Sequence, residues 1–254
     1  MRIGIMGAIP QEVDLIRSDM NITEEVTLGG RTFYVGELHG CDVVLVFSRI
    51  GKVAASSVTT TLINLFKIDF LLFTGVAGAV HPDLNIGDIV IGEVLYQHDM
   101  DGRPLFPKFH IPLTEKDSFL SHENDLSCAE RCIVDFFQEI EKYIDKKALA
   151  EFSIVAPKGI RGTIATGDQF ISNPLDHEDM IFKEEGAHAV EMEGAAVAQI
   201  CHEYNIPFLI IRTISDNANH SAAIDFQKFI TSISNHFPRG IVQKLLPELM
   251  NIVR

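Results

Sequence analysis

Ala189-Val-Glu-Met-Glu-Gly-Ala-Ala-Val197 has the pattern of a short buried strand that runs into two glutamates and then a helix. Ile210-Ile-Arg-Thr-Ile-Ser-Asp216 repeats the pattern, because its apolar run ends in Arg212 and Asp216. Charged groups are seldom left in such places without a partner or a function. Ligands of open α/β sheets bind beyond the carboxyl ends of strands. These segments therefore predict a site that handles hydroxyl groups and a proton.

A purely structural explanation remains open at this point. Glu193 and Arg212 can form a buried ion pair while Asp216 caps the next helix, and such pairs also shift acidities. However, Glu191 adds a third carboxylate beside the single arginine. Buried structural networks avoid such an excess of negative charge unless another group neutralises it. The excess favours an enzyme site.

Composition limits the class of protein. With 254 residues and 46% hydrophobic content, the chain can bury one large core, and we expect a single domain over 1–254 with a variable region over 99–160. The 35 acidic residues outnumber 21 scattered basic ones, which argues against nucleic acid and anionic membranes as partners. The start of the chain lacks an apolar signal region, and no run reaches membrane-spanning length. We expect a cytoplasmic protein with a small substrate.

Apolar periodicity predicts strands and helices in alternation. Strands are expected over 2–7, 29–38, 42–48, 69–74, 87–96, 151–166, 188–192 and 207–214, and helices over 53–66, 126–143, 175–184, 194–204 and 223–246, the last interrupted near Pro238. The proline-rich segment 99–112 predicts an ordered loop that covers part of the molecule. The alternation predicts a three-layer α/β/α sandwich with a mixed central sheet.

No cofactor or metal is expected. Gly51-Lys52 is similar to the end of a phosphate-binding loop, but Val53 follows where a magnesium-binding hydroxyl is needed. The glycines of the first strand lack the third glycine of a dinucleotide fingerprint. The four cysteines show no CxxC spacing, so we expect free thiols rather than a zinc site.

Seven motifs follow one another along nearly the whole chain. They are Arg2-Ile-Gly-Ile-Met-Gly-Ala8 with Glu12, Ile50-Gly-Lys-Val-Ala-Ala55, Thr74-Gly75 with Ala77-Gly78, Gly87-Asp-Ile-Val90, Gly167-Asp-Gln-Phe170, Val190-Glu-Met-Glu193 and Arg212-Thr-Ile-Ser-Asp216. In order and spacing they resemble the purine nucleosidase and phosphorylase superfamily, most closely the branch that acts on 5′-methylthioadenosine and S-adenosylhomocysteine. The resemblance implies a nucleoside phosphorylase-like fold, a homodimer, and hydrolysis of the N-glycosidic bond of 5′-thio-substituted adenosines.

The resemblance also implies catalytic roles. Cleavage of a ribosyl bond passes through an oxocarbenium-like state, so the leaving purine must be protonated while the sugar gains positive charge. By similarity, Asp216 donates the proton to adenine N7, Glu12 activates the attacking water, and Arg212 positions that water. Glu193 accepts hydrogen bonds from the ribose hydroxyls. For Glu12, an ordinary first-turn glutamate favoured by the helix dipole is the alternative.

The substrate-binding residues implied by the resemblance are mostly apolar. They are Met192 beneath the ribose, Phe170 stacked on adenine, the Ile171 backbone at the purine edge, Ile9, Ile50 and Val76 on the pocket wall, and Phe226 and Phe106 beside the 5′-substituent, with Phe106 reaching the site of a second subunit. Core packing is the alternative explanation for these apolar residues, above all for Phe226.

Departures from the resemblance leave the reaction and the substrate partly open. A phosphate nucleophile needs arginines, yet Phe73 stands where similar phosphorylases carry one, and Val76 replaces a usual serine. Both changes favour hydrolysis. Arg49, however, replaces a usual glycine and could bind an anion, so phosphorolysis remains an alternative. The length of chain before Gly167 indicates an extra helix. Deoxyadenosine, aminodeoxyfutalosine and binding without turnover remain alternatives.

Overall fold

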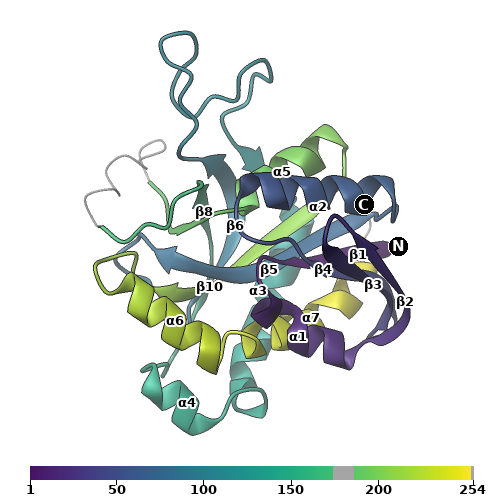
Figure 1. Cartoon of the computed structure of the whole chain (residues 1–254). Helices are drawn as coiled ribbons and strands as arrows, with labels where there is room; N and C mark the ends of the chain where they lie inside the picture. Colours follow the sequence, from purple (N-terminus) through teal and green to yellow (C-terminus); the bar gives the residue numbers. More distant parts are fainter. Residues whose placement is uncertain (174–185, 253–254) are drawn as a thin grey trace.

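The computed structural model describes residues 1–173 and 186–252, and within them one mixed β-sheet forms the centre of the molecule (Figure 1). Its strands are β1 (Arg2–Gly7), β2 (Asn21–Leu28), β3 (Arg31–Leu38), β4 (Cys41–Phe47), β5 (Phe70–Ala79), β6 (Ile89–Gln97), β7 (Phe119–Leu120), β8 (Gly159–Thr166), β9 (Ala189–Glu191) and β10 (Phe208–Asp216). They lie in the order β10-β6-β8-β9-β5-β1-β4-β3-β2, and β7 pairs with β6.

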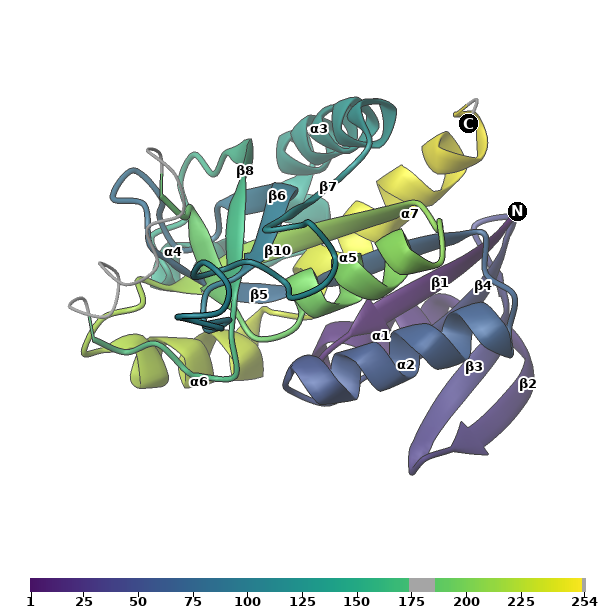
Figure 2. The same cartoon turned by 90° about the horizontal axis from the view of Figure 1, so that it is seen from above.

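Helices cover both faces of the sheet (Figure 2). On one face lie α2 (Lys52–Asn64) and α5 (Gly194–Glu203), and on the other lie α1 (Pro10–Asp19), α3 (Glu123–Gln138), the short 3₁₀ turn η1 (Ile140–Lys142) and α7 (His236–Met250). The remaining helices are α4 (Lys146–Glu151) and α6 (Ala222–Ser232), which are joined by an edge-on contact between Phe152 and Phe229. The expected three-layer architecture with a mixed central sheet is confirmed.

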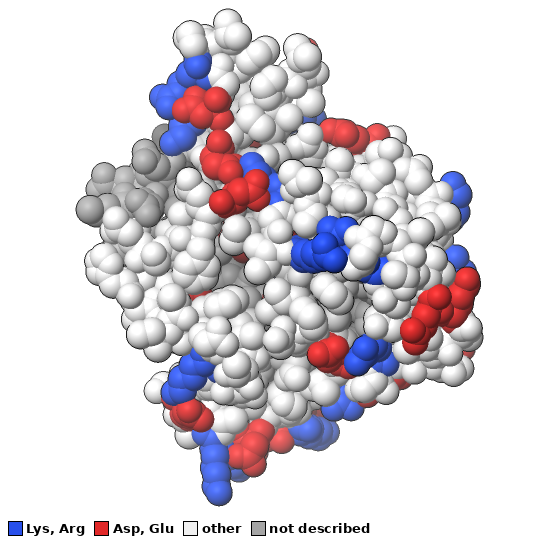
Figure 3. Space-filling view, viewed as in Figure 1, with Lys and Arg blue, Asp and Glu red and all other residues white. Residues whose placement is uncertain are grey.

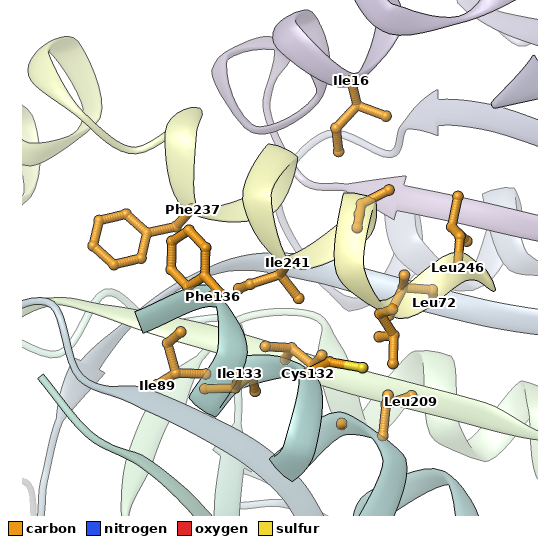
Figure 4. Packing of buried hydrophobic residues seen from close by; sticks show 14 of the residues in the cluster. Ile16, Leu72, Ile89, Cys132, Ile133, Phe136, Leu209, Phe237, Ile241 and Leu246 are labelled. Atoms are coloured by element: carbon orange, nitrogen blue, oxygen red, sulfur yellow. The ribbon is translucent and has the colours of Figure 1, made fainter. Parts of the chain in front are cut away.

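Each face of the sheet carries its own apolar core, because successive side chains of a strand point to opposite faces. In β1, Ile3 and Ile5 are buried beneath α1, α3 and α7, whereas Met6 is buried on the face covered by α2 and α5. Figure 4 shows the first of these cores, where Phe136 of α3 meets Phe237 of α7 above the sheet. Each large buried side chain contributes roughly 1.5–3 kcal/mol. The two cores hold the central strands rigidly in place.

One end of the sheet closes on itself. β5 pairs with β10 in parallel and with β9 in antiparallel orientation, so that β5, β10, β6, β8 and β9 form a ring. Asp216 of β10 lies opposite Gly78, and Val190 of β9 lies opposite the same glycine. The two acidic segments therefore meet from opposite directions across the end of β5. The rule that ligands bind beyond the carboxyl ends of strands assumes an open sheet of parallel strands. It does not describe this arrangement, because β9 runs antiparallel to β5.

Most expected elements appear within a few residues of their predicted bounds, but β2 was missed and the bounds of two other strands were wrong. β2 was not predicted, because most of its side chains are exposed and show no alternation of apolar and polar positions. Residues 151–158 are not a strand, since α4 ends at Glu151 and β8 begins only at Gly159. β5 does not stop at Thr74 but continues through the glycines to Ala79.

The closing helix expected over 223–246 is interrupted near Pro238, as predicted, and its second part continues to Met250. It is broken between Ser232 and His236, and Pro238 lies in the first turn of α7, where no backbone N–H is needed. The helix expected over 175–184 lies outside the described residues. α4 lies in the segment where chain length indicated an extra helix. Within 1–173 and 186–252, no helix combines the length and apolar character needed to cross a membrane.

Candidate active site

A cavity of about 320 Å³ lies where β5, β9 and β10 meet. In the view of Figure 3 the surface is hollowed between α6 and the start of α2. Its described lining comes from segments far apart in sequence: Ala8, Ile9, Glu12, Ile50, Val76, Ala77, Gly78, Gln169, Phe170, Ile171, Val190, Glu191, Met192, Glu193, Ser215, Asp216 and Phe226. They come together because β1, β5 and β10 are neighbouring parallel strands whose C-terminal ends point to the same place.

All predicted site residues except Arg212 and Phe106 line this cavity. Arg212 lies behind its wall and is only 1% exposed. Phe106 lies on the loop between β6 and β7, where its ring stacks on His110 at a centroid distance of 6.0 Å. The structure therefore brings the predicted acid, base and ribose ligand to one cavity of the chain, and leaves Phe106 outside it.

Asp216 ends β10 with its side chain almost fully buried. Its Oδ1 accepts the N–H of Ala218 at 2.9 Å, and its Oδ2 lies 2.8 Å from the Ser215 hydroxyl, which donates to it. Burial raises the pKa of Asp216 above its ordinary value, although these two hydrogen bonds act in the opposite direction. A raised pKa favours the protonated carboxyl that a general acid requires.

Glu12 lies in the first turn of α1 and points into the same cavity. Its Oε2 accepts the backbone N–H groups of Ala8 at 2.5 Å and Ile9 at 3.2 Å, and its Oε1 accepts that of Val76 at 3.1 Å. Burial raises the pKa of Glu12, while the Arg212 charge and the three amides oppose the rise. Glu12 thus makes the first-turn contact of an ordinary capping residue, yet it also bonds to β5 and faces the cavity.

The buried ion pair beside the cavity involves a different glutamate from the one considered in the sequence. Arg212 donates from Nη2 to Glu191 Oε2 at 2.6 Å, whereas its distance to Glu193 Oε2 is 4.0 Å. The guanidinium also lies 4.0 Å from the ring centre of Phe73, which explains why an apolar residue suits that position. Arg212 therefore pairs mainly with Glu191 and leaves Glu193 less completely neutralised.

Glu193 faces the cavity from the start of α5. Its Oε1 accepts the N–H of Gly51 at 2.8 Å. Burial and the nearby Glu191 charge raise the pKa of Glu193 to about 8, while Arg212 acts to lower it. Two carboxylates near one arginine cannot both ionise cheaply in a buried place, so Glu193 retains a proton more readily than an ordinary glutamate.

Glu191 is the residue whose position the sequence did not reveal. Its two oxygens accept the N–H of Gly194 at 2.9 and 2.8 Å, and it also receives a hydrogen bond from the Thr166 hydroxyl. An acidic residue just before a helix is a signal for such capping. Glu191 thereby fixes the start of α5 and the guanidinium of Arg212 together.

Aromatic side chains form the open side of the cavity. Phe170 is 47% exposed, and its ring meets that of Phe226 edge-on at a centroid distance of 5.6 Å. Phe226 lies on the half-buried face of α6, whereas Phe229 of the same helix is fully buried. Core packing is thus the role of Phe229, and Phe226 belongs to the cavity wall.

The comparisons with known proteins agree with this geometry. A model of the phosphorylase superfamily matches residues 2–247. A 5′-methylthioadenosine/S-adenosylhomocysteine nucleosidase of Bacillus thuringiensis is 36% identical over 249 residues, which cover 98% of this chain and 100% of that protein. The solved structure of the corresponding nucleosidase from Neisseria meningitidis, in complex with methylthio-immucillin-A, has a TM-score of 0.85 and 30% identity over 97% of this chain and 99% of that one. The futalosine hydrolase of Helicobacter pylori has a TM-score of 0.80 and 31% identity over 98% of each chain. The chain therefore belongs to the phosphorylase superfamily.

Proposed function

We propose that the protein hydrolyses the N-glycosidic bond of 5′-thio-substituted adenosines, such as 5′-methylthioadenosine and S-adenosylhomocysteine, and releases adenine. The observation that carries the proposal is the convergence of Glu12, Glu193 and Asp216 on one cavity. The nucleosidases of similar sequence and structure support the choice of substrate.

The purine occupies the part of the cavity between Asp216 and the aromatic wall. Phe170 offers a ring face for stacking. Asp216 holds its proton through burial and gives it to N7 of the leaving base. As the C1′–N9 bond breaks, its electron pair goes to the purine, which the new N7 proton keeps neutral.

The sugar and the attacking water lie between the two glutamates. Glu193 accepts hydrogen bonds from the ribose hydroxyls, and its charge stabilises the positive sugar. Glu12, oriented by the amides of Ala8, Ile9 and Val76, takes a proton from water as the water oxygen bonds to C1′. The Arg212 guanidinium offsets the charge of Glu12 from behind the cavity wall.

Water suits this cavity better than phosphate does. Among the described residues that line it are four carboxyl side chains, those of Glu12, Glu191, Glu193 and Asp216, and no lysine or arginine. A phosphate dianion is bound by arginines and donors, and carboxylates repel it. Arg49 is the residue that left phosphorolysis as an alternative in the sequence. Its guanidinium donates a hydrogen bond to the Gly30 carbonyl at 2.8 Å, and Arg49 is not among the described residues that line the cavity.

A second candidate is hydrolysis of an adenosine with another 5′-substituent. The likeness to the Helicobacter pylori futalosine hydrolase over nearly the full length of both chains favours it. The bond that breaks and the three carboxyl groups are the same in both candidates. They differ only in the group that extends beyond the ribose.

The proposal includes a homodimer in which Phe106 of one subunit reaches the site of the other. The loop that carries Phe106 also exposes Leu105 and Leu113, at 84% and 92%, and large apolar side chains of this kind favour a protein contact. Light scattering coupled to size exclusion tests the dimer, and a monomer at micromolar concentration would contradict it.

Product identification tests the reaction. We expect methylthioadenosine to yield adenine and free methylthioribose at the same rate with and without phosphate. Formation of a sugar 1-phosphate would show that the reaction is phosphorolysis rather than hydrolysis. Binding of the nucleoside without release of adenine would show that the protein is a binding protein and not an enzyme. A parallel assay with S-adenosylhomocysteine, deoxyadenosine and aminodeoxyfutalosine ranks the 5′-substituents by kcat/KM.

A further inference from the structure

Lys52, the first residue of α2, takes part in a closed ring of hydrogen bonds beside the cavity. Its Nζ donates to Asp99 Oδ1 at 2.6 Å, and its backbone N–H donates to Asp168 Oδ1 at 2.8 Å. The backbone N–H of Asp168 donates in turn to Asp99 Oδ2 at 3.0 Å. Both oxygens of Asp99 are thus engaged, and each of the three residues contacts the other two.

The ring joins three segments that are distant in sequence. Lys52 begins α2, Asp99 follows the end of β6, and Asp168 lies in the turn after β8. A further bond from Lys52 Nζ to Gln97 Oε1 at 3.1 Å ties the lysine to β6 itself. The lysine side chain is only 17% exposed and that of Asp99 21%, so solvent screens their attraction less than at the surface.

The ring lies next to two parts of the cavity lining along the chain. Asp168 precedes Gln169, Phe170 and Ile171, which line the cavity, whereas Lys52 follows Gly51, whose N–H donates to Glu193. Lys52 and Asp168 themselves are not among the described lining residues. The ring thus connects the proposed purine wall to the carboxyl proposed to hold the ribose.

The segments that the ring joins approach each other closely. A Cβ added at Gly51 would lie 3.1 Å from Asp168 Oδ1, which shows how closely the start of α2 approaches the turn after β8. A Cβ at Gly167 would overlap Nε2 of His98, the residue before Asp99. The backbone of the turn therefore lies against the end of β6 on one side and against α2 on the other.

We propose that Lys52 is a positioning residue, which holds the wall at 169–171 and the Glu193 carboxyl at a fixed separation. It does so by donating hydrogen bonds from Nζ to Asp99 and from its backbone N–H to Asp168. The lysine touches neither substrate nor reacting atoms, and it acts through the segments it joins. The kinetic consequence rests on the proposed function, whereas the structural consequence does not. A displacement of about 1 Å in a substrate wall can cost roughly 10²-fold in rate.

Lys52→Met tests this role, because methionine keeps the length of the side chain and removes its charge and donors. We expect faster amide hydrogen exchange in the peptide spanning 167–171, together with a KM for methylthioadenosine raised roughly 10- to 100-fold and a smaller change in kcat. Lys52→Arg, which keeps the charge, restores part of the affinity. Asp99→Asn removes the negative charge and leaves one acceptor oxygen where Lys52 and Asp168 use two, so we expect the same pattern.

Lys244→Met is the matched control. Lys244 Nζ bonds to Glu139 at 2.7 Å between α3 and α7, remote from the cavity, and its side chain is also partly buried. We expect this variant to leave both the KM and the exchange at 167–171 unchanged. The proposal is overturned if Lys52→Met and Asp99→Asn match the control in both measurements. If the unaltered protein releases no adenine, the proposed function fails, and hydrogen exchange alone still decides the role of Lys52.

Discussion

Asp216 of β10 lies directly opposite Gly78 of β5, and a Cβ at Gly78 would come within 2.9 Å of its Oδ1. The same Cβ would also lie 3.0 Å from the Cβ of Ala218, which donates its N–H to that carboxyl. The glycine therefore sets the position of the proposed acid from the neighbouring strand. Sequence alone marks Gly78 only as part of a motif.

Gly78→Ala should consequently displace the carboxyl without removing it. We expect kcat to fall by about 10- to 100-fold while the protein stays folded, because misplacement of a catalytic group is costly even when its chemistry is intact. Steady-state kinetics together with thermal unfolding separate the two effects. Unchanged kcat in a folded variant would show that the approach of Gly78 is not needed.

Asp216→Asn should remove the proton donor and keep the shape of the cavity. We expect kcat to fall roughly 10²- to 10⁴-fold, with binding of methylthioadenosine retained. Asp225→Asn is the control, because Asp225 lies on α6, outside the described lining of the cavity, and acts on Asp216 only through its charge. If both variants lose the same activity, or neither does, Asp216 is not the general acid.

Glu191→Gln should test stability as well as activity. The substitution leaves the Arg212 charge buried without its main partner, and breaking a buried pair from one side costs about 3–5 kcal/mol. Urea denaturation measures the loss. The exposed pair between Arg17 and Asp14, at 3.6 Å, provides the comparison, and Asp14→Asn should change the unfolding free energy by less than about 0.5 kcal/mol.

The sequence predicts the local elements of this site better than it predicts their partners. The apolar strands β1, β5 and β10 are predicted because each is a short run buried on both faces, whereas their order in the sheet is not predicted. Which of two glutamates reaches Arg212 depends on the turn after β9, and no periodicity shows that. Only the fold brings Lys52 to Asp99 and Asp168, which lie 47 and 116 residues further along the chain.

The pH dependence of kcat should be bell-shaped, because kcat reports the bound complex, in which the ribose already holds Glu193 ionised. Glu12 must be ionised and Asp216 protonated, and burial raises the pKa of both above their ordinary values. Activity therefore rises as Glu12 loses its proton and falls as Asp216 loses its own, with both limbs above the usual carboxyl range. A profile that stays flat from pH 4 through neutrality would exclude this pair of roles.

Nucleoside binding should release protons near neutral pH. Burial and the Glu191 charge raise the pKa of Glu193 to about 8 before a nucleoside binds, so much of this residue is protonated at pH 7. Ribose hydroxyls that donate hydrogen bonds to Glu193 favour its ionised form, lower its pKa, and so expel the proton. Calorimetry with the slow Asp216→Asn variant, repeated in buffers of different ionisation enthalpy, measures the number released. We expect a net release at pH 7 that disappears at pH 9, where Glu193 is already ionised, and that is absent when Glu193→Gln is added. If protons are taken up, or if release persists in the Glu193→Gln variant, the titrating group is not Glu193. Such a result would contradict the proposal that Glu193 binds the ribose hydroxyls.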